Sequence, residues 1–219
     1  MDRRSARAAR RDDLSGAGPT LGDRPIARFP GATGAFGLLG EVLLVGVLVA
    51  VASLPLVTLP AAFAAGVGHL RRYLNAEDSR IAGFWRDLRD SLRGGVVVGL
   101  VAALVAALLV SDLALVATGA LPGGDLIGVV GWIGLVALAL VLCIAAGEWT
   151  RSGGWRAAVR AVPGYVRTDV RGALYLVCAV GFVGVMAWTL VPLVVPALGC
   201  AVLAIVAVPE RPRRDDDDQ

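Results

Sequence analysis

The sequence contains no lysine and only one histidine, His69, and these gaps exclude much of the chemistry that enzymes use. Histidine is the usual general base of hydrolytic sites, so a single one leaves no serine–histidine–carboxylate set and no metal-binding cluster. Three cysteines, Cys143, Cys178 and Cys200, lie inside apolar stretches without CxxC spacing. They indicate small packing residues and neither a disulfide framework nor a metal site. We therefore predict that the chain is not an enzyme.

No cofactor is expected either. Residues 31–37, GATGAFG, superficially resemble a dinucleotide-binding loop. Such a loop must follow a buried strand and open a helix of a βαβ unit. Here it follows a stretch with arginine and proline and precedes a long apolar run, so it indicates a flexible approach to a membrane helix.

What the chain does contain is apolar surface. Of its 219 residues 57% are hydrophobic, and the mean hydropathy is +0.72, whereas a soluble domain has about 45–50% apolar residues. A membrane-spanning helix needs about 20 residues, and residues 36–54, 95–118 and 126–147 meet that length. The fold class we predict is all-α, a polytopic transmembrane helical bundle. The bias toward alanine, valine, glycine and arginine is typical of bacterial proteins from genomes rich in G and C.

Two further regions depend on proline. Pro55 and Pro60 each remove a backbone donor, so we expect the first helix to break there. Residues 61–73 then either return through the membrane or continue outside it. Residues 173–208 carry no charge over 36 positions, about 54 Å as one helix, which is too long for a single span. A bend at Pro192 and Pro196 divides them into two helices, so we predict about six membrane helices, two of them short and broken by proline.

The arginines predict the topology. With six crossings, all 21 arginines lie on one side of the membrane, in residues 1–35, 71–94, 148–172 and 209–219. The opposite side holds none. Because positively charged loops stay in the cytoplasm, both termini are expected inside. A five-span alternative, with residues 36–73 as one crossing, would place 7 arginines outside.

The same pattern divides the chain and suggests its surroundings. We expect a disordered, arginine-rich cytoplasmic arm over 1–35, a transmembrane domain over 36–208 and a charged cytoplasmic tail over 209–219. The net charge of +3 comes from arginines beside membrane helices. Anionic lipid head groups of a bacterial inner membrane are therefore the expected counter-charge, and nucleic acid is not an expected partner.

An amphipathic helix is expected in the first inner loop. In residues 84–93, Phe84, Trp85, Leu88 and Leu92 have helical spacing, with arginine and aspartate predicted on the other face. This pattern favours a helix at the membrane interface. Residues 155–171 repeat the theme of tryptophan, spaced arginines and then a span. The repeat indicates either a weak internal duplication or two ordinary arginine-rich connectors.

Three stretches resemble a known signature: residues 53–65 (SLPLVTLPAAFAA), 69–74 (HLRRYL) and 84–88 (FWRDL). They are similar to the YesL family of small bacterial integral membrane proteins of unassigned function. The specific likeness covers about 45 residues, 51–95, and the chain departs from it in its long arm and its few aromatics in the first helix. The resemblance implies an accessory role near carbohydrate uptake systems and supplies no site residues.

Four ionisable residues within or beside the predicted spans are the candidate polar sites: Asp112, Glu41, His69 and Glu148. An intramembrane carboxylate is unfavourable unless it is paired or hydrated, and it therefore marks a candidate functional site. Glu148 lies at the inner boundary, where it can reach water or pair with an arginine. Glu41 could pair with an arginine of the arm. Asp112 is the strongest candidate, either for transport or for hydrogen bonding to Ser111, Thr118 or a neighbouring helix.

Two functional hypotheses follow. The first is a non-enzymatic accessory protein that associates with transporter subunits or with itself, in a system such as carbohydrate uptake. The second is a small oligomeric permease or channel with a polar pathway through Asp112 and Glu41.

Overall fold

The computed structural model describes residues 34–119 and 123–210, and every regular element in them is a helix. The arm and most of the tail lie outside these residues. Seven α-helices and two 3-10 turns follow one another along the described chain: α2 Ala35–Ala52, η1 Leu56–Thr58, α3 Leu59–Leu74, α4 Ile81–Ala117, α5 Gly124–Glu148, α6 Gly154–Thr168, α7 Val170–Thr189, η2 Val191–Leu193 and α8 Val194–Ala207. The fold is an all-α bundle of membrane type, as predicted.

Four helices, α2, α4, α5 and α7, are long and apolar enough to cross a membrane. The two short helices are also present. With 16 residues in α3 and 14 in α8, they are about 24 Å and 21 Å long. Both lie after a proline-containing break, since η1 separates α2 from α3 and η2 separates α7 from α8. Pro60 and Pro196 fall in the first turns of α3 and α8, where a missing backbone N–H breaks no helical bond.

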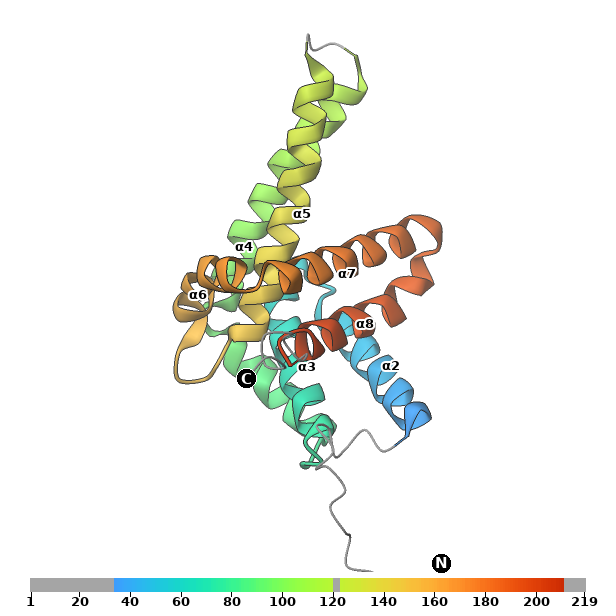
Figure 1. Ribbon diagram of the computed structural model, residues 1–219, viewed down its shortest axis with the longest axis vertical. Helices are drawn as coiled ribbons and strands as arrows, with labels where there is room; N and C mark the ends of the chain where they lie inside the picture. Colours follow the sequence, from blue (N-terminus) through green and yellow to red (C-terminus); the bar gives the residue numbers. More distant parts are fainter. Residues whose placement is uncertain (1–33, 120–122, 211–219) are drawn as a thin grey trace, which may run out of the picture.

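Helix α3 is the centre of the molecule despite its length. It contacts α2, α4, α5 and α8, and residues 60–67 are all buried. Around it, α4 and α5 form a hairpin that projects away from the other helices, whereas α7 and α8 form a second hairpin that leaves in another direction (Figure 1). Small residues make the centre possible, because Ala61, Ala62, Ala64 and Ala65 bring neighbouring helices close.

Helix α4 joins the predicted amphipathic helix to the next predicted span. Backbone angles leave the helical region at Arg93 and at Gly94, whose φ is +87°. Only glycine adopts that value without strain, so it allows the helix to turn sharply there. Trp155 of α6 packs beside Gly94 and donates a hydrogen bond of 2.6 Å from Nε1 to the carbonyl oxygen of Ser91. This bond fixes α6 against the bend.

The predicted apolar face of the amphipathic helix was wrong at Asp87, which was expected on the polar face, and at Trp85, which was expected on the apolar face. Phe84 and Leu88 are buried as expected, but Asp87 and Ser91 share their face, and Trp85 is exposed. Residues 84, 87, 88 and 91 are one helical stripe by the i, i+3, i+4 rule, and the stripe packs on α3. An aspartate is tolerated on it because arginines from other segments neutralise its charge.

Two glycines of α4, Gly95 and Gly99, have packing roles, unlike Gly124 and Gly128 of α5. A side chain on Gly99 would clash with the main-chain carbonyl of Val57 in η1, and one on Gly95 would lie 2.9 Å from the indole of Trp155. Gly124 and Gly128 meet only Val116, at ordinary van der Waals distance. The first pair therefore permits close helix packing, and the second does not require glycine.

Candidate functional site

The most connected polar group in the described residues is a cluster around Asp87. Its Oδ2 accepts a hydrogen bond of 2.7 Å from Arg72 of α3, and its Oδ1 accepts one of 2.6 Å from Arg151, which follows α5. Arg151 also pairs with Asp90 at 3.1 Å. We call these four residues the Asp87 cluster. It ties together α3, the first part of α4 and the loop between α5 and α6.

The members of the cluster differ in how deeply their side chains are buried. The side chain of Asp87 is 8% exposed, that of Arg72 26% and that of Arg151 54%. A buried carboxylate needs its charge balanced, and two charge-assisted hydrogen bonds provide that balance. The cluster therefore serves structure through Asp87, while the half-exposed guanidinium group of Arg151 stays available to other ligands.

A second polar contact joins α2 and α3. His69 is completely buried, and its Nε2 lies 2.6 Å from Oε1 of Glu41. The expected pairing of Glu41 with the arm concerns residues outside the described ones, and the partner in the structure is His69. The sequence indicated this contact only through depth, because Glu41 lies about one and a half turns after the start of α2 and His69 a similar distance before the end of α3. Nδ1 of His69 has no hydrogen-bond partner among residues 34–119 and 123–210.

Asp112, the strongest candidate from the sequence, is far along the projecting α4–α5 hairpin. Its side chain is exposed on the surface of α4. Within the described chain it makes no hydrogen bond or ion pair, and the hydroxyl of Ser111 donates instead to the carbonyl of Ala107 at 2.7 Å. The structure therefore does not bring Asp112 together with Glu41 or His69.

Glu148 is the last residue of α5 and is exposed. The arginine that follows it, Arg151, pairs with Asp87 and Asp90. Within the described residues Arg151 therefore pairs with these two aspartates and not with Glu148, whose side chain is exposed at the surface.

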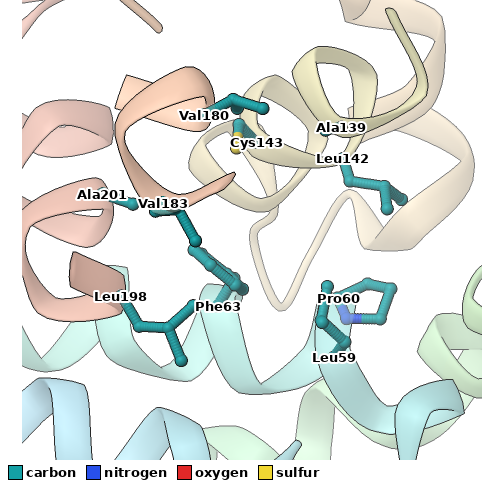
Figure 2. Close-up of a pocket in the computed structure, with 10 residues that line it drawn as sticks. All are labelled: Leu59, Pro60, Phe63, Ala139, Leu142, Cys143, Val180, Val183, Leu198 and Ala201. Carbon is teal, nitrogen blue, oxygen red and sulfur yellow. The ribbon is translucent and has the colours of Figure 1, made fainter. Parts of the chain in front are cut away.

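An apolar cavity of about 160 Å³ lies between α3, α5, α7 and α8 (Figure 2). Its lining is almost entirely hydrocarbon, with the sulfur of Cys143 as the exception: Leu59, Pro60, Phe63, Ala139, Leu142, Cys143, Val180, Val183, Leu198 and Ala201. Such a site has no group that could orient or activate a polar substrate. It can accept only apolar matter such as part of an acyl chain.

No group of three or more histidine, cysteine, aspartate or glutamate side chains in the described segments lies close enough to hold a metal ion. Cys143, Cys178 and Cys200 are free thiols.

Comparison of the chain with protein-family models, curated proteins and solved structures found no match.

Proposed function

We propose that this chain is a non-enzymatic membrane protein that acts by associating with other membrane components through its α4–α5 hairpin. The observation that carries the proposal is Asp112. It lies in α4, whose most apolar stretch is only 11% buried, the lowest share among the four candidate spans of the described chain. A carboxylate in such surroundings is unfavourable without a partner.

Lipid covers apolar side chains but does not neutralise a carboxylate. Leu108, one turn before Asp112, is 68% exposed, so the apolar and acidic parts of the surface lie on one helical face. A polar or basic side chain from a neighbouring membrane helix would satisfy Asp112 while its own helix covers Leu108. This arrangement supports association over an isolated existence in lipid.

The cellular setting belongs to the same proposal. The one-sided distribution of arginine supports six crossings of a bacterial inner membrane with both termini in the cytoplasm. The resemblance to the YesL family supports a partner among the subunits of a carbohydrate uptake system. Self-association is the other form that the interaction can take.

Purification from native membranes tests the proposal. The tagged full-length protein is extracted in mild detergent, and the co-purifying proteins are identified by mass spectrometry. We expect membrane-transport subunits to accompany the wild type and the Asp125→Asn control, which changes an exposed aspartate in the first turn of α5. Asp112→Asn should lose them. Recovery of the protein alone would contradict the accessory role.

The permease hypothesis requires Asp112 to line a polar pathway. A polar pathway must line a route across the membrane, whereas Asp112 is exposed near the end of α4 and Glu41 contacts His69 between α2 and α3. Only an assembly of several copies could surround a path with Asp112. Flux in reconstituted vesicles that falls on Asp112→Asn, together with a discrete homo-oligomer, would favour this function over the first.

A further inference from the structure

A second cavity, of about 460 Å³, lies beside the Asp87 cluster and differs from the apolar cavity in its charge. It opens where the end of α3, the start of α4 and the residues after α5 meet. Its lining includes Arg72, Arg80, Arg86, Arg151, Asp87 and Gly83. We call it the arginine cavity.

Positive charge exceeds negative charge in this cavity. Four arginines face two carboxylates, since Asp78 also lines it. Asp87 holds Arg72 and Arg151 in place, and Arg80 pairs with Asp78 at 3.1 Å. Arg86 has no carboxylate partner within the described residues. The cavity thus presents guanidinium groups whose orientation is partly fixed before any ligand arrives.

One hydrogen-bond donor of Arg72 is unsatisfied within the described segments. Nη2 of Arg72 is buried and has no hydrogen-bond partner in the described part of the chain. It lies against the first turn of α4, where a side chain on Gly83 would come within 3.1 Å of it. Because an unsatisfied buried donor is unfavourable, an acceptor that reaches this atom would be bound favourably.

The N-terminal end of α4 adds partial positive charge to the arginine cavity. The helix begins at Ile81, and no side chain caps it. The positive end of a helix favours an anion, and Ala82 and Gly83 of this turn line the cavity, where the N–H of Gly83 already donates to the carbonyl oxygen of Arg80 at 2.8 Å. Planar guanidinium groups match the oxygens of phosphate in pairs.

We propose that the arginine cavity binds the phosphate group of an anionic ligand. Arg86, Arg72 and Arg151 contact the phosphate oxygens, and Asp87 positions two of these arginines. The ligand is either the head group of an acidic phospholipid or a free phosphate compound. Because the cavity is lined by the first turns of α4 and Asp112 lies near the other end of that helix, loss of partner recruitment by Asp112→Asn and loss of phosphate binding are separate results.

The test uses full-length protein purified in detergent and Arg86→Gln, which removes one charge without breaking an ion pair. Arg89→Gln is the matched control, because Arg89 is exposed on the same helix and does not line the cavity. Equal melting temperatures without phosphate establish that all three proteins are folded. Two binding measurements follow: retention of phosphatidylglycerol from mixed phosphatidylcholine nanodiscs, by native mass spectrometry, and stabilisation by inorganic phosphate or glycerol phosphate.

We expect Arg86→Gln to weaken binding about tenfold, the loss of one charge-assisted contact, and Arg89→Gln to match the wild type. Selective retention of phosphatidylglycerol identifies the lipid as the source of the phosphate, whereas stabilisation by the soluble anions alone identifies a free phosphate compound. The proposal is overturned if neither ligand binds, or if both variants weaken binding equally, because the effect would then be general surface charge.

Discussion

Replacing Asp87 by asparagine removes the charge at the centre of the Asp87 cluster and keeps the size of the side chain. The carboxylate is 8% exposed and accepts hydrogen bonds from Arg72 and Arg151 at 2.7 and 2.6 Å. Breaking a fully buried ion pair costs about 3–5 kcal/mol. Because Arg151 is 54% exposed and water can solvate it, we expect a smaller loss, about 2 kcal/mol.

The free energy of unfolding, measured by SDS titration in mixed micelles, checks this value. Asp90→Asn is the matched control, since Asp90 is 40% exposed and meets the same Arg151 at 3.1 Å. An exposed pair of this kind contributes about 0–1 kcal/mol. If Asp87→Asn were no more destabilising than Asp90→Asn, the assignment of Asp87 as the structural centre of the cluster would be refuted.

Three further substitutions test the packing of the helices by the same titration. Gly99→Ala should lower the free energy of unfolding by about 1–3 kcal/mol, because its side chain meets the η1 main chain, whereas Gly184→Ala, in open space on α7, should not. Gly94→Ala should cost about 1–2 kcal/mol, because alanine is strained at φ +87°; equal stability would contradict a required bend. Glu41→Leu should cost about 1–3 kcal/mol, since it leaves the buried His69 without its partner; an unchanged value would show that their contact does not stabilise the fold.

Much of the helical framework could be predicted because its causes are local. Apolar length predicted α2, the second part of α4 and α5. Pro55, Pro60 and Pro192 marked the breaks through their missing backbone donors, and the break at Pro192 separated α7 from α8. Gly94 also acts locally, through its own backbone angles. These features need no knowledge of which helices touch.

The polar contacts could not be predicted in the same way, because they depend on packing between distant segments. Asp87 and Arg151 are 64 positions apart in the sequence. The spacing of residues 84–93 is compatible with more than one buried face, and hydrophobicity alone favoured Trp85 over Asp87. Only the docking of α4 on α3 and the arrival of Arg151 make the aspartate acceptable on the inner side.

The candidate polar residues show the same difference between local features and contacts that depend on packing. Depth within the spans identified Glu41, His69, Asp112 and Glu148 as unusual, but it gave no partners. In the structure Glu41 and His69 meet, whereas Asp112 and Glu148 are exposed in different parts of the molecule. The arginine cavity could not be predicted from the sequence because its lining residues come from three separate segments.

The most direct test of the proposed function is site-specific photo-crosslinking in native membranes. A photoreactive residue replaces Leu108, on the face of Asp112, and in a second protein Val185, which is 57% exposed on α7. We predict a discrete protein adduct from position 108 and none from position 185. The absence of any protein adduct from position 108, with lipid as the only product at both positions, would contradict association through the α4–α5 hairpin.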